Sequence, residues 1–119
     1  MASILIVEDE PRVAEVIADA LRQLNHEPRV AETAGDALMI VETERPDAIL
    51  LDINLPDSTG ISTLDCLHQV RPDVPIIMVT GNTDAELARD TLKRGAFDYV
   101  MKPFDLDRLA RVVEVALAS

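Results

Sequence analysis

Short apolar segments alternate with longer amphipathic segments along this chain. The apolar segments are rich in Val, Ile and Leu and have the length of buried strands, so each predicts a strand. In the amphipathic segments apolar residues recur every three or four positions, as on one face of a helix. We predict strands at Ser3–Val7, Pro28–Glu32, Asp47–Asp52, Pro75–Val79 and Phe97–Met101. We predict helices from Pro11 to a close near Asn25, from an N-cap at Thr33 through Glu42, after Gly60 to about Val70, from Asp84 to Arg94 and from Asp105 to Ala118.

The regular alternation of strand and helix indicates a parallel sheet with helices on both faces. The run Ala48–Leu51 has no polar position, as expected for a strand covered on both sides, whereas Pro28–Glu32 is weaker and suits an edge. We therefore expect an α/β fold, a (βα)5 three-layer sandwich, made by one domain at residues 1–119. The helix residues expected to face inward are Val13, Val16, Ile17, Ala20, Leu21, Leu24, Ala37, Leu38, Val41, Ile61, Leu64, Leu67, Val70, Leu87, Ala88, Thr91, Leu92, Leu106, Leu109, Val112, Val113 and Ala116.

Composition narrows the range of functions. The formal net charge is −11, which argues against direct nucleic-acid binding by this segment, because contacts to phosphates need Lys and Arg. The single cysteine, Cys66, excludes an intrachain disulfide and fits a reducing compartment. We expect Cys66 to be a small packing residue of its helix. No segment has the length of a membrane span or of a secretory core, so we expect a cytoplasmic protein that does not contact membranes.

Polar residues stand at the carboxyl ends of the predicted strands. In an open parallel sheet these ends meet at one edge, which is where ligands bind. The residues concerned are Glu8 and Asp9 after the first strand, Asp52 at the end of the third, Thr80 after the fourth and Lys102 after the fifth. The strand pattern alone therefore predicts that these side chains converge.

Three carboxylates in one pocket repel one another, and a divalent cation would remove the conflict. Because all the candidate ligands are oxygens, the metal should be a hard one, Mg²⁺ or Mn²⁺. Asp9 and Asp52 would bind it directly and Glu8 through water, while the backbone carbonyl of Asn54 could add a ligand. The alternative is a salt-bridge network of Glu8, Asp9 and Lys102 without chemical function.

Phosphoryl transfer uses this set of groups more fully than a salt-bridge network does. The reaction needs an aligned acceptor oxygen, a metal and donors for the phosphoryl oxygens. Asp52 would be the nucleophile and would become an acyl phosphate. Lys102 would pair with a phosphoryl oxygen, and Thr80 would offer a hydroxyl donor.

The motifs that carry this pattern are Glu8-Asp9, Leu51-Asp52-Ile53-Asn54-Leu55-Pro56 with Gly60, Thr80-Gly81 and Lys102-Pro103. Together they resemble the receiver domain of two-component response regulators, in the same order and over essentially the whole chain. The resemblance implies a flavodoxin-like fold with strand order 2-1-3-4-5. It also implies a phosphorelay role, in which a histidine kinase or histidine phosphotransfer protein phosphorylates Asp52 and Mg²⁺ is required.

The resemblance implies further roles for individual residues. Tyr99 is similar to the family's switch aromatic, and Thr80 to its conserved hydroxyl. The Lys102-Pro103 bond is often cis in this family, and Asn54 and Asn82 would border the phosphoryl group. Glu8 stands where Asp is commoner, which should alter a water-mediated contact without abolishing metal binding.

For the protein as a whole, the resemblance implies a signalling switch rather than an enzyme, catalysing only its own phosphorylation and dephosphorylation. Its output would pass to a downstream effector domain or protein. Homodimerisation would use the surface of the fourth helix, the fifth strand and the fifth helix.

Two other hypotheses about the function of a chain with this fold remain. One is an interaction module that is never phosphorylated, although such a module would be expected to have lost part of the site. The other is a nucleotide-binding enzyme or a haloacid-dehalogenase-like phosphatase. A nucleotide site needs a phosphate-cradling loop after the first strand, where this chain has acidic residues and Pro11. The phosphatase would need a second Asp two residues after Asp9, where Pro11 stands.

Overall fold

Strand and helix alternate throughout the chain, as predicted. The computed structural model describes residues 1–81, 85–102 and 105–119. Its elements are β1 (Ser3–Val7), α1 (Pro11–Gln23), β2 (Glu27–Ala31), α2 (Ala34–Thr43), β3 (Ala48–Asp52), α3 (Gly60–Val70), β4 (Ile76–Gly81), α4 (Ala85–Lys93), β5 (Asp98–Lys102) and α5 (Leu106–Ala118). No helix among these residues is long and apolar enough to cross a membrane.

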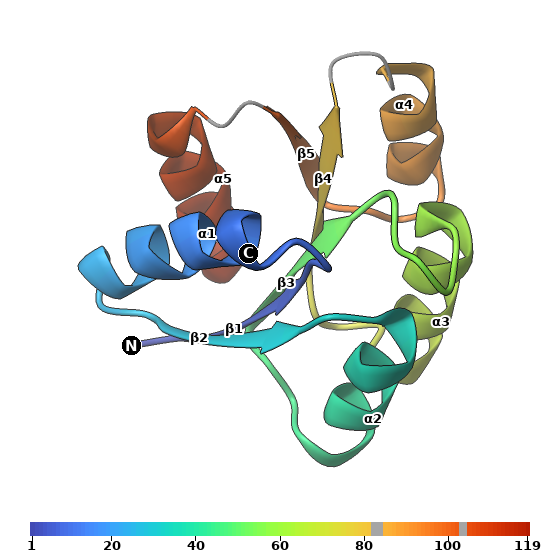
Figure 1. Cartoon of the computed structure of the whole chain (residues 1–119), viewed down its shortest axis with the longest axis horizontal. Helices are drawn as coiled ribbons and strands as arrows, with labels where there is room; N and C mark the ends of the chain where they lie inside the picture. The colour runs from blue at the N-terminus through green and yellow to red at the C-terminus, as the bar shows by residue number, and fades with distance from the viewer. Residues whose placement is uncertain (82–84, 103–104) are drawn as a thin grey trace.

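The strands form one parallel sheet in the order β2-β1-β3-β4-β5. This confirms the predicted three-layer sandwich and its strand order, with β3 at the centre and β2 at an edge. Helices α1 and α5 cover one face of the sheet, and α2, α3 and α4 cover the other (Figure 1). The carboxyl ends of all five strands therefore lie along a single edge.

Alternate residues of each central strand serve opposite faces of the sheet, because strand side chains have a period of two. In β3, Ala48 and Leu50 pack under α1 and α5, whereas Ile49 and Leu51 pack under α2, α3 and α4. All four are buried. The uninterrupted apolar run thus supplies both hydrophobic clusters, which confirms the prediction of a strand covered on both sides.

Several helix residues that were expected to face inward are exposed instead. Val16 is 47% exposed and Leu106 is 45% exposed. In α1 the buried positions include Ala14 and Ala18, whose small side chains let the helix lie close to the sheet. The apolar stripe of each helix is wider than the strip that contacts the sheet, so residues at its border reach solvent. The same correction applies to Val70, Leu92 and Cys66.

The edge that carries the polar residues is built slightly differently from the prediction. Strands β4 and β5 run on to Gly81 and Lys102, because Thr80 pairs with Met101 and Gly81 pairs with Lys102. Thr80 and Lys102 are therefore strand residues rather than residues that follow a strand. The expected helix start at Asp84, the Lys102-Pro103 bond and Asn82 lie outside the described residues.

Candidate functional site

Pairing in the sheet brings Glu8 and Asp52 to the same level. Val7 pairs with Leu51, so the next residues of the two chains are Glu8 and Asp52. The amide of Glu8 still bonds to the carbonyl of Ala31, at 2.9 Å, which keeps this residue in line with β1. Glu8 and Asp52 are 2% and 4% exposed. Two carboxylates are therefore placed side by side in a nearly dry environment.

The period of two along β5 aims Lys102 at these acids. Val100 packs under α1 and α5, so Lys102, two positions later, stands on the same face of the sheet. Its Nζ lies 3.1 Å from Oε1 of Glu8 and 3.5 Å from Oδ2 of Asp52. A single ammonium group thus faces both carboxylates.

Asp9 completes a group of three acids. One carboxylate oxygen each from Glu8, Asp9 and Asp52 lies within 4.8 Å of the others, and Asp9 is half-buried. Among the described residues, Oε1 of Glu8 has no hydrogen-bond donor although it is buried, since Lys102 approaches it outside hydrogen-bond geometry. A buried acceptor without a donor beside two further carboxylates fits a hard divalent cation. The predicted convergence of acids is confirmed, and the identity of the metal stays a prediction.

Burial makes the electrostatics of this group unusual. Burial, together with the neighbouring Asp52, raises the pKa of Glu8 to about 7. Burial by itself would lower the pKa of Lys102, but the charges of Asp52 and Glu8 outweigh it and the pKa lies above its usual value. Lys102 is therefore a permanent cation in this site, while Glu8 binds or releases a proton near neutral pH.

The side chain of Asp52 is oriented by its own loop. The amide of Asn54 donates to Oδ1 of Asp52 at 3.1 Å, which leaves Oδ2 on the side of Lys102. Asn54 also forms an isolated antiparallel bridge with Thr59, so the loop between them is closed at its base. The role of the Asn54 carbonyl as a metal ligand stays a prediction.

Gly60 locks the base of this loop. A Cβ atom at Gly60 would lie 2.7 Å from the carbonyl oxygen and from the side chain of Ile53, closer than real contacts allow. Only glycine lets the start of α3 pack against the residue that follows Asp52. The sequence pattern included Gly60, and the structure supplies its physical reason.

Thr80 and Tyr99 lie on the other face of the sheet from Lys102. Thr80 is fully buried, and its hydroxyl donates to the carbonyl of Gly81 at 3.3 Å. Tyr99 is partly buried against the cluster under α2, α3 and α4. Because Thr80 pairs with Met101, the period of two places Thr80 on the same face as Tyr99. Within the described part of the chain, no hydrogen bond joins Thr80 to Asp52.

Asp57 is a residue whose role sequence reasoning missed. The residue patterns described above do not single out Asp57, yet its carboxylate accepts hydrogen bonds from the backbone amides of Ala34 and Gly35. No periodicity or motif links these positions, which are more than twenty residues apart. Only the folded chain reveals the contact.

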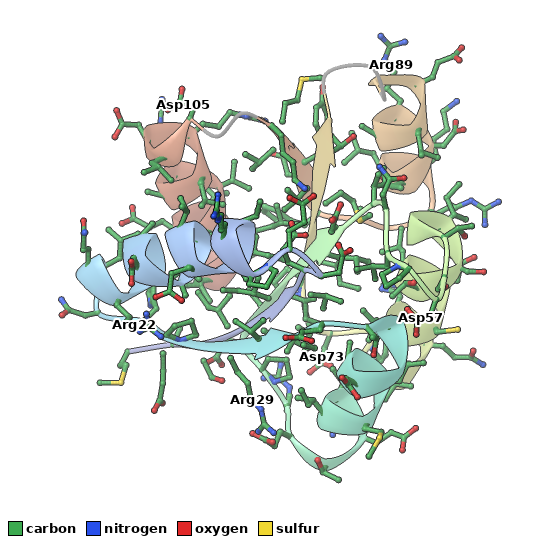
Figure 2. The ribbon with its side chains drawn as sticks, viewed as in Figure 1. Arg22, Arg29, Asp57, Asp73, Arg89 and Asp105 are labelled. Atoms are coloured by element: carbon green, nitrogen blue, oxygen red, sulfur yellow. The ribbon has the colours of Figure 1, made fainter. Side chains whose placement is uncertain are left out.

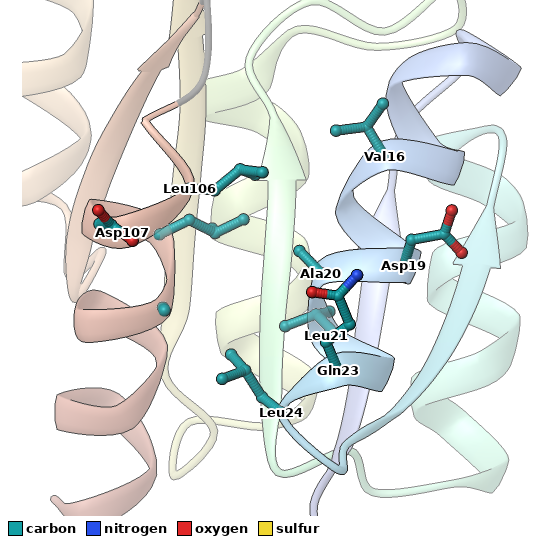
Figure 3. Close-up of a pocket in the computed structure, with 10 residues that line it drawn as sticks. Val16, Asp19, Ala20, Leu21, Gln23, Leu24, Leu106 and Asp107 are labelled. Atoms are coloured by element: carbon teal, nitrogen blue, oxygen red, sulfur yellow. The ribbon is translucent and has the colours of Figure 1, made fainter.

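A separate cavity of about 350 Å³ lies between α1 and α5. Side chains from this part of both helices point into this space, among them the exposed Leu106 of α5 and Leu24, which directly follows α1 (Figure 3). Neither the three acids nor Lys102 line it. Val16 and Leu106 line this cavity, which contains none of the chemical groups at the strand ends.

Comparison with known proteins agrees with this geometry. Residues 4–114 match the family described as "Response regulator receiver domain". The chain is 40% identical over 118 residues to the nitrogen assimilation regulatory protein NtrX of Azorhizobium caulinodans, and 38% identical over 114 residues to the regulatory protein AtoC of Escherichia coli. These matches cover 98% and 96% of this chain but 26% and 25% of the relatives, so the chain spans about a quarter of their length.

A solved structure shows the same fold. The receiver domain of NtrX from Brucella abortus superimposes with a TM-score of 0.94 at 36% sequence identity. The match covers 98% of each chain.

Proposed function

This chain belongs to the response regulator receiver domain family, and we propose that its residues 1–119 act as a phosphoacceptor domain in which Asp52 takes a phosphoryl group from a histidine kinase or a histidine phosphotransfer protein. The observation that carries the proposal is the position of Asp52. It ends the central strand, lies beside Glu8 and Asp9, and faces Lys102 at 3.5 Å.

The transfer is a displacement at phosphorus. A carboxylate oxygen of Asp52 forms the new P–O bond while the P–N bond of the phosphohistidine breaks and the imidazole leaves as a neutral base after taking up a proton. Water later cleaves the acyl phosphate, which restores the carboxylate and releases inorganic phosphate. The hydrogen bond from Asn54 holds one oxygen of Asp52 and leaves the other oriented for attack.

The remaining residues stabilise charge. Lys102 pairs with a phosphoryl oxygen, because its ammonium group stands in front of the attacking oxygen of Asp52. Asp9 and Asp52 would hold Mg²⁺ directly, with Glu8 acting through water and the carbonyl of Asn54 as a further ligand. When bound, the ion neutralises negative charge on the phosphoryl oxygens and on the carboxylates. The orphaned Oε1 of Glu8 and the hard oxygen ligands support this assignment.

The switch works through the opposite face of the sheet. Phosphorylation draws Thr80 toward the phosphoryl group, and Tyr99 turns into the space that Thr80 leaves. The shared face of these two residues supports the coupling. Helix α4 can respond at low cost, because Ala88 and Thr91 are its only fully buried residues among those described. The surface formed by α4, β5 and α5 changes as a result.

The altered surface would be the output of the domain. It would bind a downstream effector domain or protein, or a second phosphorylated copy of the chain. The relatives are named as regulatory proteins and are about four times as long as this chain. Their extra length supports the proposal that an effector domain or protein responds to the altered surface. The only reactions assigned to the chain itself are its phosphorylation and dephosphorylation.

The decisive test uses a small phosphodonor. The chain is incubated with acetyl phosphate and Mg²⁺, and intact mass spectrometry should show the addition of one phosphoryl group. Asp52→Ala and Asp52→Asn should abolish the addition, and a chelator should suppress it in the wild type. A wild-type chain that shows no mass change, or an Asp52 variant that still gains the group, would overturn the proposal. Failure to bind Mg²⁺ would instead favour an interaction module that is never phosphorylated.

A further inference from the structure

Asp57 joins two parts of the molecule that are far apart in sequence. It belongs to the loop between β3 and α3, and it lies beside the first turn of α2 (Figure 2). Its Oδ1 accepts a hydrogen bond from the amide of Ala34 at 3.0 Å, and its Oδ2 accepts one from the amide of Gly35 at 3.1 Å. Both oxygens of one carboxylate are thus used on two successive amides.

These amides are at the start of a helix, where backbone N–H groups have no partner within the helix. Thr33 caps the same turn locally, since its hydroxyl oxygen accepts from the amide of Asp36 at 3.1 Å. The negative charge of Asp57 is favourable next to the positive end of the helix dipole. The two donated hydrogen bonds lower the pKa of Asp57 below its usual value, so it is ionised at neutral pH.

The other end of the loop reaches the phosphoacceptor. The amide of Asn54 holds Oδ1 of Asp52, and the bridge between Asn54 and Thr59 closes the loop. Gly60 fixes the base against Ile53. A loop this short has few ways to rearrange once its base and its tip are both held. Without the bonds of Asp57, only the contacts at the base would hold the loop, so Asn54 would be placed less firmly beside Asp52.

We propose that Asp57 is a positioning residue for the phosphoacceptor site, because it clamps the loop of residues 53–59 onto the first turn of α2 and so sets the placement of Asn54 beside Asp52. This role rests on the proposed function of Asp52. Asp57 touches neither the phosphoryl group nor the metal in this assignment, and acts only through the loop.

The coupling must be reciprocal. If the clamp favours the arrangement of Asn54 and Asp52 that binds Mg²⁺, then Mg²⁺ must strengthen the clamp by the same factor. Binding at the strand ends would then slow the exchange of the Ala34 and Gly35 amides. Helix α2 would thereby sense the state of the site.

Hydrogen exchange measured by NMR on the metal-free chain tests the clamp itself. The amides of Ala34 and Gly35 should be protected in the wild type and should exchange faster in Asp57→Ala. The matched control is Thr33→Ala, which removes the other cap of the same turn. That variant should expose the amide of Asp36 and leave Ala34 and Gly35 protected. Equal loss at all three amides in both variants would show general fraying of the helix and overturn the clamp.

Titration with Mg²⁺ tests the positioning role. Asp57→Ala should weaken Mg²⁺ binding by roughly three- to tenfold, somewhat less than the loss usually caused by removing a residue that directly orients a metal ligand. Asp57→Asn should fall between wild type and Asp57→Ala, since its amide has one acceptor oxygen for two N–H donors. Thr33→Ala should bind Mg²⁺ as the wild type does. Both variants at position 57 should keep their fold, because the residue is exposed.

The outcomes separate this role from the proposed function. If the wild type binds Mg²⁺ and is phosphorylated on Asp52, but Asp57→Ala does both equally well, the role of Asp57 is overturned alone. If Thr33→Ala and Asp57→Ala weaken Mg²⁺ binding equally, Asp57 is merely a helix cap. If the wild type neither binds Mg²⁺ nor accepts a phosphoryl group, the proposed function is overturned and the positioning role with it.

Discussion

Two groups of ion pairs stand at opposite ends of the central strands and make use of similar residues. At the carboxyl end, Lys102 lies 3.1 Å from Glu8 and 3.5 Å from Asp52. At the other end, in the connections that lead into β3 and β4, Arg45 contacts Asp73 at 2.7 Å. The second contact is shorter and has two donor atoms of Arg45 on one carboxylate oxygen.

The two groups of ion pairs differ in how deeply their side chains are buried rather than in the distance between their charged atoms. The side chains of Glu8 and Asp52 are 1% and 5% exposed, whereas those of Arg45 and Asp73 are 48% and 61% exposed. Water screens the charges of Arg45 and Asp73, so their attraction is weak and its loss should reduce the stability of the folded chain only slightly. The buried acids cannot be hydrated and must find a cation or a proton. The buried pair therefore has chemical consequences that the exposed pair lacks.

The largest difference is expected when each cation is replaced by the uncharged Met. Lys102→Met should slow phosphorylation of Asp52 by acetyl phosphate by about 10²–10³-fold, the usual loss when a group that stabilises developing charge is removed. Arg45→Met should leave the rate unchanged, because its site lies at the other end of the strands. The rates are followed by intact mass spectrometry at fixed Mg²⁺. Equal rates in the two variants would contradict the assigned role of Lys102.

Next in size is the dependence of stability on pH, which Glu8 should cause in the absence of metal. Its pKa is about 7 in the folded chain and 4.5 as its ordinary value. The folded state therefore holds the proton more tightly, and the stability that this provides is present below pH 4.5 and is lost as pH rises through about 7. The loss is at most about 3 kcal/mol, from 1.36 kcal/mol per pKa unit. Urea unfolding between pH 5 and pH 8 measures it, and Glu8→Gln should flatten this part of the profile.

Addition of Mg²⁺ sharpens the same comparison. The ion needs ionised carboxylates, so it should stabilise the wild type more at pH 8 than at pH 5. The free energy of unfolding of the metal-free wild type should not rise between pH 5 and pH 8 relative to that of Glu8→Gln. Such a rise would contradict the raised pKa of Glu8. So would an effect of Mg²⁺ that is the same at both pH values.

The smallest effect is expected at the exposed pair. A double-mutant cycle of Arg45→Ala and Asp73→Ala should show a coupling worth roughly 3 °C or less in melting temperature. High salt should reduce it further, because both groups are exposed to solvent. A coupling that is large and insensitive to salt would contradict the conclusion that exposure to solvent makes the pair of Arg45 and Asp73 weaker than the buried group.

The clustering of the site residues was predictable because it follows from local patterns. The residue pattern predicts β1, β3 and β5, and the rule that parallel strands end at one edge brings Glu8, Asp9, Asp52 and Lys102 together. The two-residue period along a strand needs no knowledge of distant partners. The same applies to the alternation of strands and helices, which implies the layered fold.

Tertiary structure decided the features that depend on contacts between distant residues. The exposure of Val16 and Leu106 depends on how wide a strip of each helix the sheet covers. The raised pKa of Glu8 depends on how completely its neighbours exclude water. The hydrogen bonds of Asp57 to the start of α2 depend on two segments that meet only after folding. The sequence alone determined which chemical groups reach the strand ends, and packing determined how they are held and charged there, because burial and long-range contacts have no periodic signature in the chain.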